Sequence, residues 1–133
     1  MKVTLQKPIS DEYTIHGLVF NVVEGYEYTV FGLFSPDGVE DSENIYICIM
    51  DDRYDSSDSD SNELYPVWLP LKNFKITNPK IPNDWQISYW DTEISGYLTT
   101  FAEWSTDNSF YYWLVDGRRQ EANIFKKYFD LYV

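Results

Sequence analysis

The sequence contains very few of the side chains that usually carry out catalysis or bind transition metals. Among its 133 residues it has one cysteine, Cys48, and one histidine, His16. A single cysteine excludes an intrachain disulfide, and a zinc site usually needs several cysteines and histidines. Phosphate-binding glycine motifs and nucleophile elbows are also absent. The sequence therefore predicts no cofactor, no metal and no enzymatic activity, and it predicts structural roles for Cys48 and His16.

Basic residues and long apolar runs are scarce too. Lys and Arg number 10 against 22 Asp and Glu, which gives a formal net charge of −12. No basic stripe is available to neutralise phosphates, so we expect no direct binding of nucleic acid or of anionic membranes. No run approaches the roughly 20 apolar residues of a membrane helix, and charged residues interrupt the N-terminus before any signal-length apolar stretch. We therefore expect a cytoplasmic protein without membrane contact.

Aromatic residues, in contrast, are abundant. They make up 19% of the chain and include five tryptophans, and the hydrophobic fraction is 44%. This composition is far from that of a disordered chain and predicts a single packed domain over residues 1–133. The tryptophans could form a sugar-stacking platform or a core; we expect the core, with one or two exposed rings as interface anchors.

Runs of β-branched and aromatic residues predict mostly β-strands. We expect a hairpin of 18–24 with 28–34 and a central covered strand at 44–50. Because of its prolines, 64–70 is expected to be an edge strand or an irregular segment. The remaining expected strands are 71–76, 85–91, 94–104 and 109–115.

The last segment changes to a period near 3.6 residues, which predicts an amphipathic helix over about 118–131. We expect Phe125 and Phe129 on its apolar face to pack on the sheet. The predicted fold class is therefore α+β: a mainly antiparallel sheet of about six or seven strands with one C-terminal helix packed on it.

The acidic residues are concentrated in one region. Residues 37–63 hold ten acids against the single base Arg53, and the densest part is DDRYDSSDSDSNE at 51–63. This loop does not match an EF-hand, because a frame beginning at Asp58 has Glu63 where glycine is required and Leu69 where glutamate is required. Either the loop is only solvated, or the region binds a cationic partner. The predicted partner-binding residues are Asp37, Glu40, Asp41, Glu43, Asp51, Asp52, Asp55, Asp58, Asp60 and Glu63.

These features favour a small acidic protein that inhibits a basic partner, such as a toxin or a nuclease. In overall character the chain is similar to immunity proteins that neutralise bacterial nuclease-type toxins, a likeness of composition and charge rather than of a motif. A phage-type mimic of nucleic acid that blocks a defence protein would use the same electrostatics. The rival hypothesis is a small glycan-binding or glycan-active β domain that uses Asp91, Glu93 and tryptophans.

Overall fold

The computed structural model describes residues 1–7, 14–15, 18–19, 22–37, 45–50, 64, 66–91 and 95–132. The strands are β1 (Lys2–Leu5), β2 (Thr14–Ile15), β3 (Leu18–Val19), β4 (Glu27–Thr29), β5 (Gly32–Pro36), β6 (Tyr46–Met50), β7 (Pro66–Pro70), β8 (Phe74–Asn78), β9 (Trp85–Asp91) and β10 (Ser95–Phe101). The helices are the 3-10 turn η1 (Leu71–Asn73) and the α-helices α1 (Ala102–Ser105), α2 (Phe110–Val115) and α3 (Arg119–Tyr132).

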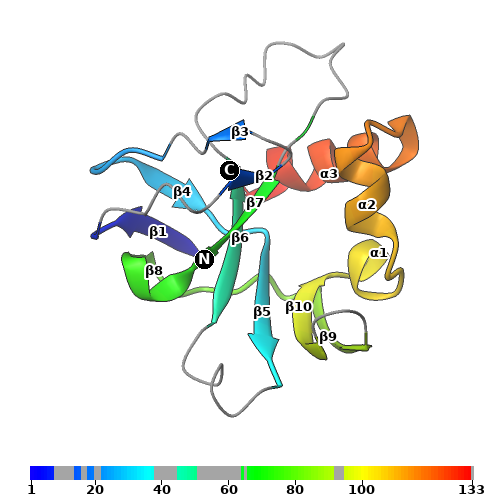
Figure 1. The fold of residues 1–133 in the computed structure, drawn as a ribbon, viewed down its shortest axis with the longest axis horizontal. Helices are drawn as coiled ribbons and strands as arrows, with labels where there is room; N and C mark the ends of the chain where they lie inside the picture. The colour runs from blue at the N-terminus through cyan, green and yellow to red at the C-terminus, as the bar shows by residue number, and fades with distance from the viewer. Residues whose placement is uncertain are drawn as a thin grey trace.

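Among the described residues, eight strands form two antiparallel sheets. The large sheet has the order β7-β6-β5-β10-β9 and the small sheet has the order β4-β1-β8, while β2 and β3 pair with each other. Figure 1 shows the small sheet beside β6 and β7, and the three α-helices on the other side of the large sheet. The predicted α+β class, with mainly antiparallel strands and a C-terminal helix, is confirmed.

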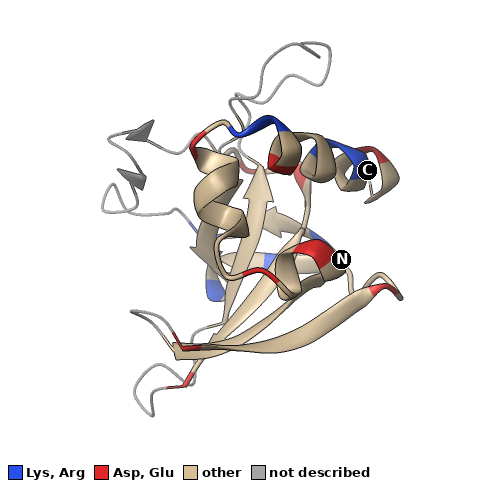
Figure 2. Cartoon of the chain, turned by 90° about the vertical axis from the view of Figure 1, so that its right-hand side faces the viewer, with Lys and Arg blue, Asp and Glu red and all other residues tan. Residues whose placement is uncertain are grey.

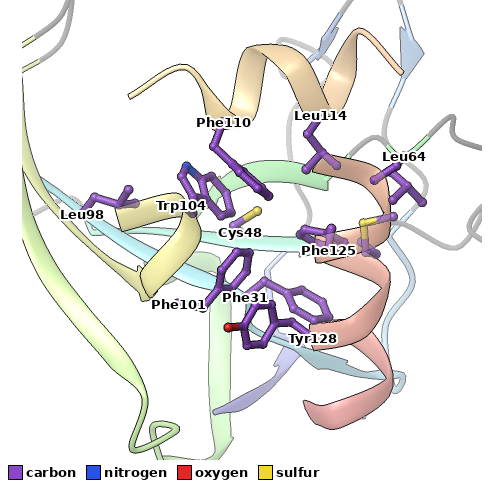
Figure 3. Close-up of a cluster of buried hydrophobic side chains, with 12 residues drawn as sticks. Phe31, Cys48, Leu64, Leu98, Phe101, Trp104, Phe110, Leu114, Phe125 and Tyr128 are labelled. Atoms are coloured by element: carbon purple, nitrogen blue, oxygen red, sulfur yellow. The ribbon is translucent and has the colours of Figure 1, made fainter. Parts of the chain in front are cut away.

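Strand β6 explains why the molecule has two cores. Successive side chains of a strand point to opposite faces of the sheet. Ile47 and Ile49 belong to the cluster between the two sheets, whereas Cys48 and Met50 belong to the cluster beneath the helices. Figure 3 shows the second cluster, with Cys48 among rings and aliphatic side chains from the helices. The prediction that 44–50 contains a central strand covered on both faces is confirmed.

Helix α3 covers the helix-side cluster with its apolar stripe. Phe125 is 1% exposed, and its ring centroid lies 4.9 Å from that of Phe31. The Phe129 ring stacks on Phe31 at 5.7 Å. A chain reversal at Gly117, whose φ is +81°, precedes the helix and suits glycine because the left-handed region penalises a Cβ. The predicted helix and the packing of both phenylalanines are confirmed.

The expected strand at 109–115 is wrong, because Phe110–Val115 forms helix α2. Phe110 and Leu114, four positions apart, are buried on one side of this helix, while Tyr112 and Trp113 are exposed. A continuous run of aromatic residues hides this helical spacing. The strand expected over 94–104 ends at Phe101, where the short helix α1 begins.

The predicted hairpin of 18–24 with 28–34 is also wrong. Within 28–34, β4 pairs with β1 of the small sheet, and β5 pairs with β6 and β10 of the large sheet. The chain crosses between the sheets at Val30 and Phe31, whose amides donate to the carbonyls of Met1 and Cys48. Both side chains are buried at the junction, so burial rather than a hairpin turn accounts for the apolar run.

The tryptophans lie mainly in the core, as expected. Trp104 is fully buried, and Trp68, Trp85 and Trp90 pack partly buried against the helix-side cluster. Trp113 is 41% exposed. The predicted edge strand with prolines is confirmed as β7, which Pro66 and Pro70 begin and end.

Candidate functional site

Of the ten acids predicted to bind a partner, the structure describes Asp37. The other nine lie outside the described residues, namely Glu40, Asp41, Glu43, Asp51, Asp52, Asp55, Asp58, Asp60 and Glu63. Glu93 and His16 lie outside them as well. The site is therefore built from Asp37 and from the described residues around it.

The two acidic parts of the region are attached to opposite ends of β6. The chain enters this strand at Tyr46 after residues 38–44 and leaves it at Met50 before residues 51–63. Asp37 lies at the first of these ends, directly after β5. Its amide donates to the carbonyl of Ser95 over 3.0 Å, so the last residue before 38–44 lies beside the first residue after 92–94.

Asp37 is held in place by a tyrosine on the outermost strand. The hydroxyl of Tyr89 donates to Asp37 Oδ2 over 2.7 Å. This hydrogen bond, with some desolvation and the nearby charges of Asp37 and Asp91, raises the pKa of Tyr89, although a bond with Ser95 opposes the shift. The hydroxyl therefore stays protonated and remains a donor. The Ser95 hydroxyl in turn donates to Asp91 Oδ1 over 3.2 Å.

Large apolar side chains are exposed directly beside these carboxylates. Tyr89 and Tyr97 are cross-strand partners on β9 and β10, their ring centroids are 5.2 Å apart, and each is about half exposed. Ile87, two positions from Tyr89 on the same face, is 72% exposed. We call Asp37, Ile87, Tyr89, Asp91 and Tyr97 the acidic–aromatic surface.

This surface is exposed because the large sheet is wider than the layer that covers it. The register places Ile87 beside Thr99 of β10, then Leu33 of β5 and Ile47 of β6, all on one face. The small sheet covers Ile47 completely and Leu33 in part, but its cluster does not include Ile87. The face therefore continues from a buried core to an open surface.

Sequence reasoning did not identify Ile87, Tyr89 or Tyr97 as site residues. In the β9 segment WQISYWD, bulky side chains occur at both odd and even positions, so alternation alone does not show which face is covered. The structure gives the answer, because Trp90 packs against the helix-side cluster while Tyr89 points to the open side. Identifying the exposed residues would require knowing the width of the small sheet. That width depends on the pairing of strands that are far apart in the sequence.

Electrostatics distinguishes this end of the molecule from the helical side. Figure 2 shows acidic residues at the ends of the long strands, whereas the helices on the opposite side of the molecule carry both acidic and basic residues. The basic residues in α3 are Arg119, Lys126 and Lys127. The strand ends with Asp37 and Asp91 are therefore acidic, whereas α3 mixes its three bases with the acids Glu121 and Asp130.

Two chemical groups do not contribute to this surface in the described part of the chain, namely the cysteine thiol and a cluster of metal ligands. The Cys48 thiol lies in the core, where burial raises its pKa well above the usual range, so it is not a surface nucleophile. Within the described ranges no group of three His, Cys, Asp or Glu side chains is placed to hold a metal ion. No described helix is long and apolar enough to cross a bilayer.

Comparison with known proteins leaves the site to be interpreted from its own residues: no family model matches the chain, and neither a curated protein nor a solved structure shows significant similarity to it.

Proposed function

We propose that this protein binds and inhibits a basic partner protein, in the way that an immunity protein neutralises a bacterial nuclease-type toxin. The observation that carries the proposal is the hydrogen bond between Asp37 and Tyr89 at the start of the acid-rich region. It joins a carboxylate to an exposed aromatic pair. With a cationic protein, carboxylates raise the association rate and aromatic side chains lower the dissociation rate.

The carboxylates favour rapid association. Residues 37–63 contain ten acids and one base, and complementary charge raises association rates far above those of neutral partners at low salt. A nuclease binds phosphates in a cationic groove, so a dense set of carboxylates competes for that groove. This argument supports inhibition by occupancy of a nucleic-acid site.

The aromatic side chains favour slow dissociation. Tyrosine is enriched among residues that dominate interface energies, because its ring buries a large area and its hydroxyl forms a hydrogen bond. Tyr97 is 51% exposed and contacts Tyr89 edge to face. The glycan hypothesis receives less support, since four of the five tryptophans pack on the core and Trp113 lies on α2 and not on β9 with Asp91.

The test is protection of bacterial cells from cationic nuclease toxin domains. We expect co-expression of this chain with its cognate toxin to restore growth, and the purified pair to form a complex whose association rate falls steeply with added salt. Tyr97→Ala should weaken binding by about 2 kcal/mol or more, roughly 30-fold in Kd.

Tyr112→Ala is the matched control, because Tyr112 is 62% exposed on helix α2. It should change the Kd by less than about threefold. Equal losses in the two variants, or failure to protect against any member of a broad panel of cationic toxin domains, would contradict the proposal.

A further inference from the structure

In the described part of the chain the two main sheets have four edge strands, and three of these strands carry features that discourage pairing with another chain. β7 begins and ends with proline. β4 has only three residues and includes Glu27. β8 contains Lys75, and its register with β1 shifts between Lys2 and Val3. Prolines, charges, short length and bulges are the usual protections of an exposed edge.

Strand β9 has none of these protections over most of its length. Its seven residues, WQISYWD, contain no proline and no basic residue, and its only charge is Asp91 at the end. It pairs with β10 through seven consecutive residues without a bulge. In the part of the chain that the structure describes, no strand pairs with its other side. A long, regular and uncharged edge of this kind is a template for another strand.

Contacts at the start of β9 define how much of the edge is available. The Ser105 hydroxyl of α1 donates to the carbonyl of Gln86 over 3.4 Å, so this backbone acceptor already has a partner. The available part runs from Ile87 to Asp91, about 17 Å at the usual rise per residue. A partner segment of about five residues fits this length.

The charges around β9 specify which kind of strand it would accept. Asp91 ends the strand, and Asp37 is bound to Tyr89 in its middle. Residues 92–94 and 38–44, which contain Glu93, Glu40, Asp41 and Glu43, continue directly from these positions. A second copy of the chain, with its own net charge of −12, would be repelled at this end. A segment with lysine or arginine at alternate positions would be attracted.

We propose that β9 is a docking edge to which a basic partner adds an extended, lysine- or arginine-bearing segment as a further strand of the large sheet. Backbone hydrogen bonds along 87–91 provide the pairing, Ile87 and Tyr89 contact alternate side chains of the added strand, and the carboxylates select for positive charge. This inference rests on the proposed function and adds the mode of docking to it.

The experiment uses the full chain and three capped peptides of about ten residues, a length that spans the available edge. The first peptide alternates lysine with valine and threonine. The second is the same peptide with alternate backbone nitrogens methylated, which removes donors on one edge but keeps the charge. The third has glutamate in place of lysine. Binding is measured by calorimetry, and protection of the β9 amides is measured by hydrogen exchange.

We expect the lysine peptide to bind and to protect amides within 87–91, and the methylated peptide to bind at least about tenfold more weakly, because several hydrogen bonds are lost. Ile87→Lys should weaken binding by a similar factor through like charge. Ile76→Lys makes the same change on edge strand β8, where Ile76 is 42% exposed, and should leave binding within about twofold of wild type.

The results that would overturn docking at β9 differ from those that would overturn the preference for a basic partner. Docking at this edge would be overturned if the lysine peptide did not bind, if the methylated peptide bound equally well, or if the protected amides lay away from β9. It would also be overturned if the free protein sedimented as a dimer that Ile87→Lys dissociates. Equal binding of the glutamate peptide, or binding that is unaffected by salt and by Asp37→Asn, would instead contradict the preference for a basic partner.

Discussion

At the scale of single residues, tyrosine hydroxyls of α3 connect this helix to α1 and to the start of β9. Tyr128 donates to Glu103 Oε2 over 2.6 Å, and Tyr132 donates to Asp84 over 3.1 Å while accepting from the indole of Trp85. Burial and these carboxylates raise the pKa of both tyrosines well above the ordinary value of 10.0. Each hydroxyl is therefore held in its protonated form in the folded state.

A raised pKa of tyrosine in the folded state predicts how stability changes in alkaline solution. The unfolded chain releases these protons near pH 10, whereas the folded chain retains them, so their stabilisation is complete below pH 10 and is lost as the pH rises toward the folded pKa. We expect the urea midpoint to fall between about pH 10 and 11.5. Replacing Tyr128 and Tyr132 together with Phe should flatten this decline.

The control for this experiment is Tyr112→Phe, at an exposed position on α2. It should keep the wild-type decline of the midpoint with pH. A decline that is equally steep in the double variant and in wild type would show that other groups cause the alkaline loss.

At the scale of elements, the apolar stripe of α3 holds this helix against the helix-side cluster. Removing the Phe125 ring should destabilise the protein by about 3–5 kcal/mol, because the ring is fully buried against Phe31. Thermal unfolding of Phe125→Ala should show this as a drop of many degrees. Leu131→Ala on the same helix, at a side chain that is 69% exposed, should change the midpoint little. Similar midpoints for the two variants would mean that the apolar stripe is not what holds the helix.

The elements differ in how well the sequence predicts them, and the difference follows from the range of the interactions. Helix α3 and strand β9 are predictable because their patterns are local, namely a 3.6-residue stripe and a strand bounded by loops. Helix α2 is missed because six apolar residues in a row satisfy both periods. A usable local signal was present, since the Asp107 side chain accepts from the amide of Ser109 just before the helix.

The candidate site also has one part that the sequence predicts and one part that it does not. Its acidic component is visible in the sequence, as the place of Asp37 at a strand end shows. Its apolar component, including Tyr97, depends on a pairing of β10 with β5 that joins residues far apart in the chain. No local pattern contains that information. The division of 28–34 between two sheets was unpredictable for the same reason.

At the scale of the whole molecule, the acids of 51–63 should contribute to association and not to folding. We expect replacement of Asp51, Asp52, Asp55, Asp58 and Asp60 with Asn to preserve the fold and to raise the melting midpoint slightly at low salt, because self-repulsion falls. The gain should disappear near 1 M salt, where the screening length is about 3 Å. Association with the basic partner should become slower and less dependent on salt.

Thermal scans at two salt concentrations and stopped-flow association measure these effects. A lower midpoint in the neutralised variant would show that the carboxylates make structural contacts. An association rate and a salt slope equal to those of wild type would mean that 51–63 does not steer the partner, and the acidic–aromatic surface alone would then carry binding.

The pairing of β1 with β8 and of β5 with β10 also sets the order of events during synthesis on the ribosome. The N-terminal strand of each pair emerges first. At 5–20 residues per second, the strand that pairs with it is synthesised roughly 3–15 s later. The helix-side core stays open longer still, because α3 (Arg119–Tyr132) follows all the strands in the chain and emerges after them. During this interval the helix-side face of β6, with Cys48 and Met50, has no cover, so chaperone binding to nascent chains should end only after α3 has emerged. Ribosome-bound chains stalled before Arg119 should retain a chaperone that the released protein does not bind.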